Sequence, residues 1–283
     1  MVEEKDYKGQ TPEWCPGCGN FSLLNTLKKT LIGLEIKPHE LIVVSGIGQA
    51  AKLPHYLRCN AFNGLHGRAL PVATGIAMSN PEMPVLVTTG DGDCYGEGGN
   101  HFLHAIRRNA NITLFVHDNQ IYGLTKGQAS PTTEEGTKTK TQPFGSLSSQ
   151  FNPLTMAIAM GCGFVARGFV GEHEHLQNLM TEAINFRGFA LVDIFQPCVT
   201  FNKVNTFNWY KERVYPLEDE YDEGDWLQAI DRSREWGDQI PIGIFYRQTK
   251  EIITDKIPPL KDGPLTRKIF DQQKAAGVLK EFY

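Results

Sequence analysis

The chain has 283 residues, of which 41% are hydrophobic, and a formal net charge of −4. That length suits one large domain or two modest ones with an ordinary core, while the negative charge argues against non-specific nucleic-acid binding. No stretch approaches the roughly 20 apolar residues of a membrane span. Six cysteines and no secretion signal predict a cytoplasmic protein whose cysteines bind metal rather than form disulfides.

The first motif along the chain is the cysteine pair in Trp14-Cys15-Pro16-Gly17-Cys18-Gly19. Two cysteines at this spacing can bind one metal ion or cluster, or can form a thioredoxin-like redox pair. Metal or cluster binding is favoured because no strand precedes the motif and because further cysteines could complete a ligand set. A zinc-binding interaction module is the non-enzymatic alternative.

A short apolar run at 41–44 predicts a strand, and Ser45-Gly46-Ile47-Gly48 places two permissive glycines at its carboxyl end. Farther on, Leu57-Arg58-Cys59-Asn60 carries the third cysteine, and Leu65-His66-Gly67-Arg68 carries a histidine. This histidine, His66, is either a hydrogen-bonded loop residue or a group that contacts a ligand.

The segment from 84 to 119 predicts a strand, a helix and a second strand. Residues 84–89 are apolar and β-branched and stop at Gly90-Asp91-Gly92-Asp93, while 97–109 has helical periodicity and 111–116 is again apolar. A right-handed crossover brings the carboxyl ends of both strands to one edge of the sheet. Asp91 and Asn119 are therefore expected to lie together where open α/β sheets bind ligands.

Asp91 and Asn119 predict a site for Mg²⁺ bound to a diphosphate. Mg²⁺ prefers oxygen ligands and commonly completes its octahedron with phosphate oxygens and waters. The Asp91 carboxylate, the Asn119 amide oxygen and the Ile121 carbonyl would suit it. Three neighbouring glycines would let the backbone approach the phosphates, namely Gly90, Gly92 and Gly123.

After residue 150, helices and strands continue to alternate. Helices are expected at 152–161 and 172–187 and strands at 164–169 and 189–194, which together predict an α/β fold with a doubly wound, mostly parallel sheet. Cys198 follows the last of these strands, and Cys162 is interpreted as a core residue. The aperiodic segment 128–150 is too long for a plain connection, so it is either a functional loop over a cofactor or partner, or a mobile one.

Beyond Asn202 the pattern weakens. Residues 215–226 are acidic, and Ile240 to Tyr246 could form one more strand. We therefore expect a domain at 1–202 and an irregular C-terminal extension at 203–283 that packs on this core or on a partner subunit.

The spacing of the metal motif has a known counterpart. With 26 residues between Gly92 and Asn119, it resembles the thiamine diphosphate signature, in which an Asn follows Gly-Asp-Gly after about 25 residues. The resemblance implies that Asp91, Asn119 and the Ile121 carbonyl hold Mg²⁺. It also implies that the diphosphate is lined by Gly92, Asp93, Gly123 and Leu124.

Residues 12–205 as a whole resemble the β subunit of the 2-oxoacid:ferredoxin oxidoreductases, the family that includes the pyruvate and 2-oxoglutarate enzymes. The motifs that carry the resemblance are Trp14 to Gly19, Ser45 to Gly48, His66 to Ala69, the Gly-Asp-Gly loop, Tyr122 to Gln128, and Gln196-Pro197-Cys198. They imply thiamine diphosphate, Mg²⁺ and a 4Fe–4S cluster as cofactors. They also imply a 2-oxo acid and coenzyme A as substrates, ferredoxin as electron acceptor, and a partner α subunit in a hetero-oligomer such as (αβ)2. The partner is expected to supply the glutamate that activates the cofactor.

The same resemblance places further residues at the site. Ile47, Gly48, Gln49, Ala50 and His66 are expected to contact the cofactor. His66 and Lys126 are the catalytic candidates, and Lys126 could pair with a substrate carboxylate or a coenzyme A phosphate.

The ligand set of the expected cluster departs from the family pattern. Cys15, Cys18 and Cys198 match it, but many members carry a cluster cysteine directly after Gly-Ile-Gly, where this chain has Gln49. Cys59 is expected to supply that thiolate, because a 4Fe–4S cluster takes four; otherwise the cluster is altered or absent. A non-oxidative thiamine diphosphate decarboxylase or carboligase, which needs no cluster, is the alternative enzyme.

Overall fold

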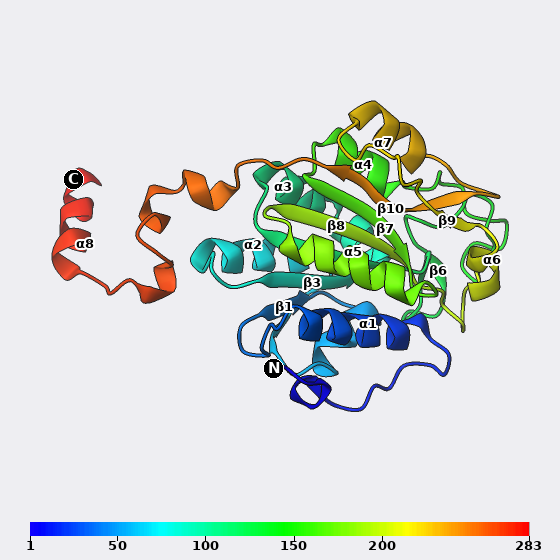
Figure 1. The fold of residues 1–283 in the computed structure, drawn as a ribbon, viewed down its shortest axis with the longest axis horizontal. Coiled ribbons are helices and arrows are strands. Elements are labelled where there is room, and N and C mark those ends of the chain that lie inside the picture. The colour runs from blue at the N-terminus through cyan, green and yellow to red at the C-terminus, as the bar shows by residue number, and fades with distance from the viewer. Residues whose placement is uncertain (283) are drawn as a thin grey trace.

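The computed structural model describes residues 1–282 as an eight-stranded sheet with helices on both faces (Figure 1). Within these residues every neighbouring pair of strands in this sheet is parallel except β10 with β7. The predicted doubly wound, mostly parallel α/β fold is therefore confirmed. The strands in spatial order are β2 (Asn60–Asn63), β1 (Ile42–Ser45), β3 (Val85–Gly90), β4 (Ile112–Asp118), β8 (Phe189–Phe195), β7 (Phe164–Phe169), β10 (Ile240–Arg247) and β9 (Val214–Pro216).

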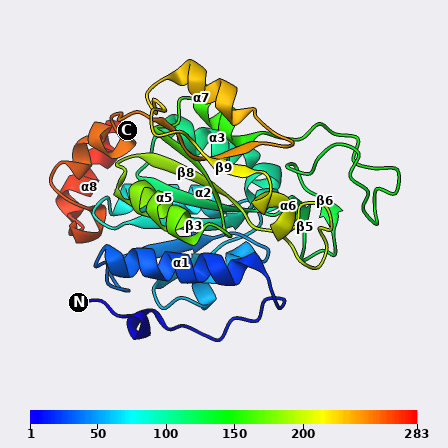
Figure 2. The same ribbon diagram turned by 45° about the vertical axis from the view of Figure 1, so that its right-hand side comes forward.

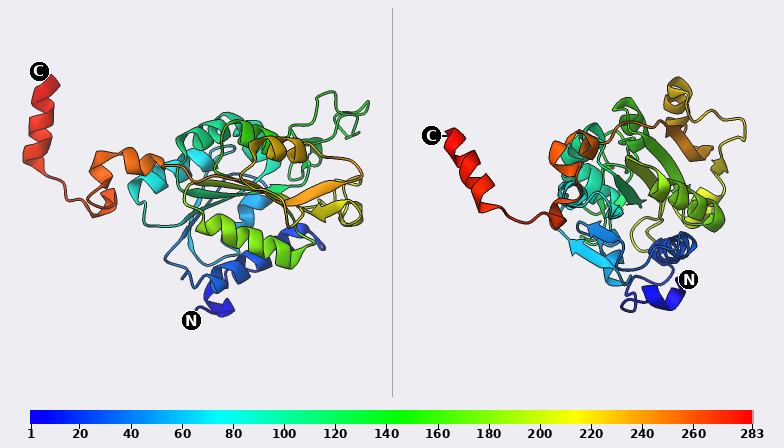
Figure 3. Two further views of the ribbon diagram at one scale, coloured as in Figure 1. Left: turned by 45° about the horizontal axis from the view of Figure 1, so that its top comes forward. Right: turned by 60° about the vertical axis from the view of Figure 1, so that its left-hand side comes forward.

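The two faces of the sheet bury separate hydrophobic cores, because successive strand residues point to opposite sides. Val43, for example, packs in one core and Val44 in the other. The first core lies under α1 (Gly19–Gly33) and α5 (His173–Asn185), and Figure 3 shows helices on both sides of the sheet. The second lies under α2 (Ala69–Ser79), α3 (Gly99–Arg108), α4 (Pro153–Ala159) and α7 (Trp226–Ser233). In this part of the chain no helix is both long enough and apolar enough to cross a membrane.

The predicted β-α-β unit is formed by β3, α3 and β4. The two strands are parallel neighbours with Gly90 opposite His117, so Asp91 and Asn119 leave the sheet at the same edge. A π-helical turn at Gly92–Glu97, which was not predicted, precedes α3. Such turns are rare and often occur at functional sites.

The chain beyond residue 202 is less irregular than expected up to residue 247. It contains α6 (Phe207–Lys211), β9, α7 and β10, and it contributes Tyr210 to the first core and Phe245 to the second. This part of the expected extension therefore packs on the core. Asp225, near the end of the acidic run, caps α7. Its carboxylate accepts hydrogen bonds from two backbone N–H groups at the start of this helix.

The segment after residue 263 lies apart from this body. α8 (Gln272–Leu279) has no buried residue, and Figures 1 and 3 show it standing away from the sheet. An ion pair between Arg267 and Glu82, 2.6 Å long and largely exposed, ties the start of the segment to the body. Such exposed pairs contribute little to stability.

Deleting residues 272–283 should leave the midpoint of thermal unfolding of the body unchanged, because α8 buries nothing. Circular dichroism melts of the shortened and full chains would measure this. As a control, Phe245→Ala in the second core should lower the free energy of unfolding by about 3–5 kcal/mol. An equally large loss on deletion would show that the segment packs on the body.

Candidate active site

A cavity opens at the carboxyl ends of β1, β3 and β4. Its lining comes from the loop 47–50, from His66, from the turn 90–93, and from residues 119 and 121–125. All the residues predicted to contact the cofactor or the divalent cation are among them. The structure thus brings these residues together, although their binding of a cofactor stays a prediction.

Asp91 is the most buried acidic group of this cavity, with 1% of its surface exposed. Burial raises the pKa of its carboxyl above the ordinary value, while nearby hydroxyls and the backbone N–H groups of Gly92 and Asn119 favour its ionised form. The Asn119 side-chain oxygen accepts a hydrogen bond from the Ile121 N–H at 3.1 Å. One lone pair of that oxygen remains available, as a metal ligand requires.

Thr132 is a site residue that the sequence analysis missed. Its hydroxyl lies 2.6 Å from Asp91 Oδ2 and 2.8 Å from Asp118 Oδ1, and it can donate its single proton to only one of them at a time. Thr132 is buried at the base of the loop between β6 (Gln128–Ala129) and α4, whose outer part projects from the body beside β5 (Ile121–Tyr122) in Figure 2. The loop therefore contributes directly to holding Asp91.

Two more buried carboxyls lie beneath Asp91. Burial raises the pKa of Asp118 well above its ordinary value and that of Asp193 to about 6. Asp193 accepts a hydrogen bond from the Tyr95 hydroxyl at 2.7 Å, and the buried Arg167 guanidinium favours its charged form. Neither Asp118 nor Asp193 lines the first cavity.

Asp93 organises the loops around the cavity. Its carboxylate accepts hydrogen bonds from the Thr89 hydroxyl at 2.5 Å and the Gly67 N–H at 2.7 Å, and His66 Nδ1 lies 2.7 Å from it. A Cβ at position 46 would collide with this carboxylate, which explains the glycine there. With its side chain held by protein donors, Asp93 would approach a diphosphate through its backbone.

His66 is oriented by this carboxylate. A hydrogen bond from Nδ1–H to Asp93 fixes the tautomer in which Nε2 carries the free lone pair. Lys126, the other catalytic candidate, is exposed and does not line the cavity, although Thr125 before it does. Its backbone has φ +79° in a tight turn closed by hydrogen bonds at residues 122–127.

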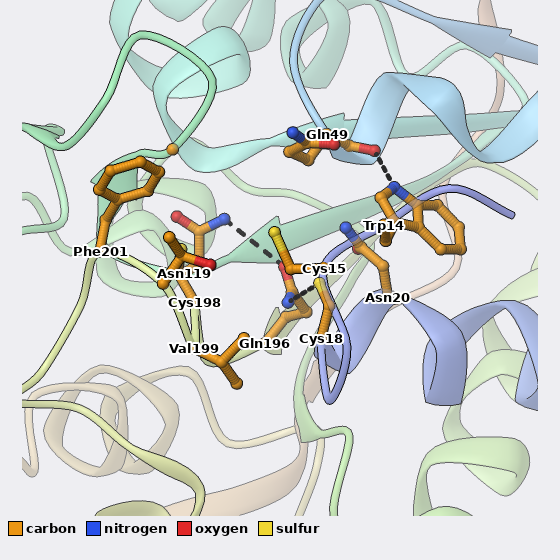
Figure 4. Close-up of a pocket in the computed structure, with 12 residues that line it drawn as sticks. Trp14, Cys15, Cys18, Asn20, Gln49, Asn119, Gln196, Cys198, Val199 and Phe201 are labelled. Carbon is orange, nitrogen blue, oxygen red and sulfur yellow. Dashed lines mark hydrogen bonds between the residues drawn. The ribbon is translucent and has the colours of Figure 1, made fainter.

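A second cavity adjoins the first (Figure 4). Cys15 and Cys18 enter it from the turn before α1, and Cys198 enters it from the end of β8. Burial raises the pKa of Cys18, and the neighbouring Cys198 and Cys15 raise it further, so both of these thiols lie near that of Cys18. Three residues line both cavities: Gln49, Asn119 and Gly123.

Gln196 connects the two cavities directly. Its Nε2 donates to Cys18 Sγ at 3.4 Å, and its Oε1 accepts from Asn119 Nδ2 at 3.5 Å. The amide is 1% exposed. Gln196 belongs to the motif that contains Cys198, but the sequence did not indicate that its side chain would bond to both Cys18 and Asn119.

The prediction that Cys59 joins the other three cysteines conflicts with the structure. Cys59 precedes β2, whose first residue pairs with the first residue of β1, whereas Gln49 follows the last residue of β1. The two positions are therefore separated by the length of the strand, roughly 10 Å. The Cys59 thiol donates instead to the Leu57 carbonyl, and burial raises its pKa to about 12.

The remaining cysteines are structural. Cys162 is 1% exposed and donates to the Phe164 and Phe189 carbonyls, which confirms its interpretation as a core residue. Cys94 is also buried, in the second core.

Comparisons with known proteins agree with this architecture. Residues 43–194 match the model of the C-terminal thiamine pyrophosphate-binding domain of thiamine pyrophosphate enzymes, and residues 198–262 match the C-terminal model of the pyruvate ferredoxin oxidoreductase β subunit. The second match covers the part of the chain that joins the sheet through β9 and β10.

Individual relatives are similar over most of the chain. A 2-oxoacid:ferredoxin oxidoreductase subunit β from Sulfolobus sp is 45% identical, over 84% of this chain and 82% of the relative. Subunit β of 2-oxoacid:ferredoxin oxidoreductase 1 from Aeropyrum pernix is 42% identical, over 88% and 79%.

A solved structure is similar as well. It is a 2-oxoglutarate:ferredoxin oxidoreductase from Magnetococcus marinus with 2-oxoglutarate, coenzyme A and succinyl-CoA bound. It aligns with a TM-score of 0.91 and 35% identity, over 98% of this chain and 96% of that one. This chain therefore belongs to the 2-oxoacid:ferredoxin oxidoreductases as a β subunit that contains their thiamine diphosphate-binding domain.

Proposed function

We propose that this β subunit, together with an α subunit, converts a 2-oxo acid and coenzyme A to acyl-CoA and CO₂ and passes the electrons through an iron–sulfur cluster to ferredoxin. In each turnover a carbon–carbon bond breaks to release CO₂, an acyl–sulfur bond forms, one proton is released, and two electrons leave singly. The observation that carries the proposal is the shared wall of the two cavities, formed by Gln49, Asn119 and Gly123.

The first cavity has the donors that Mg²⁺ and a diphosphate need. Asp91 and Asn119 offer oxygen ligands, and Ile121 between β4 and the turn at 122–127 offers its carbonyl. Gly92 leaves room for Tyr122, whose ring a Cβ at position 92 would overlap. When bound, thiamine diphosphate supplies the electron sink for decarboxylation.

The residues of the chain itself bind, orient and hold protons. His66, oriented by Asp93, presents Nε2 as an acceptor or donor toward the reacting groups. Lys126 at the rim would meet a substrate carboxylate or a phosphate of coenzyme A once the complex is assembled.

An α subunit would complete the site. Among residues 1–282 no glutamate lines the first cavity, so the activating carboxylate would come from the partner. Two apolar residues of the rim are exposed, Ile47 at 39% and Leu124 at 48%, and Phe144 and Leu147 on the projecting loop are almost fully exposed. An apolar rim of this kind fits a subunit contact, in a complex such as (αβ)2 in the cytoplasm.

The substrate is proposed to be pyruvate or 2-oxoglutarate, because residues 198–262 match a model of the pyruvate ferredoxin oxidoreductase β subunit and the similar solved enzyme has 2-oxoglutarate and coenzyme A bound. A non-oxidative decarboxylase would leave the three adjoining thiols without a role. A zinc module fits less well still, since within the described residues no three His, Cys, Asp or Glu side chains are arranged to hold one metal ion.

The co-expressed αβ complex should reduce ferredoxin or a dye with a 2-oxo acid only when coenzyme A, thiamine diphosphate and Mg²⁺ are present. The isolated β chain should show little turnover, because it lacks the partner's carboxylate. The assay compares pyruvate, 2-oxoglutarate and branched 2-oxo acids. Full activity of the β chain alone would refute the division of the site between two subunits.

Cys198→Ser should separate the two halves of the reaction. Ferredoxin reduction should fall by more than about tenfold, because a thiolate ligand of the cluster is lost, while a single turnover should still release CO₂ from labelled substrate. Cys59→Ser is the matched control and should retain both activities, because Cys59 lies outside the cavity. Equal effects of the two substitutions would contradict the assignment.

Thr132→Val should weaken Mg²⁺-dependent binding of thiamine diphosphate by about 10–100-fold, the usual effect of losing a group that orients a metal ligand. The hydroxyl holds Asp91. Thr74→Val, which removes a hydroxyl bonded only to the Leu70 carbonyl in α2, is the control. Calorimetric titration of the complex measures the affinity, and an unchanged value would show that Asp91 needs no such support.

A further inference from the structure

We propose that Cys15, Cys18 and Cys198 would be the only cysteine ligands of an iron–sulfur cluster in the cysteine cavity, because position 49, which also lines it, carries a glutamine and no thiolate. The inference rests on the proposed function for the presence of a cluster and deepens it. A 4Fe–4S cluster normally takes four thiolates, and the described residues bring three to this cavity. The cavity therefore offers one thiolate fewer than such a cluster normally takes.

The three thiols approach from two directions. Cys15 and Cys18 are joined by a turn in which the Cys18 N–H bonds to the Cys15 carbonyl at 3.0 Å, and Cys198 follows β8. A cluster spreads its ligands over several irons, so thiols from two separate segments of the chain could bind different irons of one cluster.

Gln49 occupies the remaining side. It follows β1, lines the cavity, and is fixed there because its carbonyl accepts a hydrogen bond from the Trp14 indole at 2.9 Å. Trp14 directly precedes Cys15, so this bond ties the cysteine turn to the loop that carries Gln49 (Figure 4). The fold holds position 49 against the three thiols whether or not it carries a thiol.

None of the other cysteines among the described residues can supply the fourth thiolate. Cys59 lies at the amino end of β2, and Cys94 and Cys162 are buried in the second core. Neither of these two buried thiols lines the cysteine cavity. The chain therefore offers no fourth thiolate at this site among residues 1–282.

Asn20 independently indicates a ligand in this cavity. It is fully buried and lines the cavity, and its Oδ1 lies 2.7 Å from His117 Nδ1. An amide oxygen can only accept, so the His117 Nδ1–H is the donor. The Asn20 Nδ2 has no partner among the described residues. An unpaired buried amide is costly, and a cluster sulfide would accept its hydrogen bond.

An iron without a thiolate should be labile. It can bind water or the Gln49 amide oxygen, both weaker ligands than a thiolate. On oxidation with ferricyanide, one electron passes from the cluster to the oxidant, which becomes ferrocyanide. Cys15, Cys18 and Cys198 would hold the rest of the cluster, while the iron that they do not bind would be free to leave as Fe²⁺.

The test uses the αβ complex prepared without oxygen. One equivalent of ferricyanide should release about one iron in four and produce the EPR signal of a three-iron cluster, and ferrous iron with a reductant should reverse both changes. Gln49→Cys should supply the fourth thiolate and abolish the loss. Gln49→Ala, which cannot ligate, should lose iron as the native complex does.

Several outcomes would overturn the inference. One is a native complex that keeps four irons through oxidation; another is a complex that contains no iron; a third is a Cys59→Ser complex that contains less iron than the native complex before any oxidation. The oxidation of the native complex decides the matter even if Gln49→Cys fails to fold. Ferredoxin reduction is measured on the same preparation beforehand, so failure of the proposed function is recognised separately from failure of the three-cysteine cluster.

Discussion

The site depends on one topological constraint: the carboxyl ends of the parallel strands β1, β3, β4 and β8 meet at a single edge of the sheet. Buried parallel strands satisfy their backbone groups with one another and leave their ends to loops. Here the loops after β1, β3 and β4 surround the first cavity, and the segment after β8 closes the second. Neither cavity could form from one stretch of chain.

This constraint explains why so much of the first cavity was predictable. Asp91 and Asn119 are distant in sequence, but the rule that β-α-β crossovers are right-handed places both at one edge. Gly90 pairs with His117 in the structure, so Asp91 and Asn119 do leave the sheet at the same edge. Gly46, Gly48 and Cys198 follow strand ends in the same way. For all of them, recognising a strand and its end was sufficient.

The same rule shows why Cys59 was misplaced. A cysteine ten residues after Gln49 could reach the cavity only if the chain stayed at that edge. Instead, the chain crosses over and begins β2, parallel to β1, so Cys59 lies at the opposite edge. The strand at Asn60–Asn63 is short, polar and wholly exposed, without the apolar pattern that predicts strands. Thr132 was missed for a related reason, because an aperiodic loop does not reveal which of its residues fold inward.

The residues that line both cavities determine whether a substitution can change one cavity without changing the other. The proposed cation ligands Asp91 and Asn119 follow β3 and β4, and the thiols lie on the cysteine turn and after β8, whereas Gln49 belongs to neither set and borders both cavities. A substitution at position 49 would therefore change the lining of the cysteine cavity while the Asp91 and Asn119 pair stays intact. Gln196 is not free in this way, because its one amide bonds to both Asn119 and Cys18. Any change there would disturb Asn119 and Cys18 together.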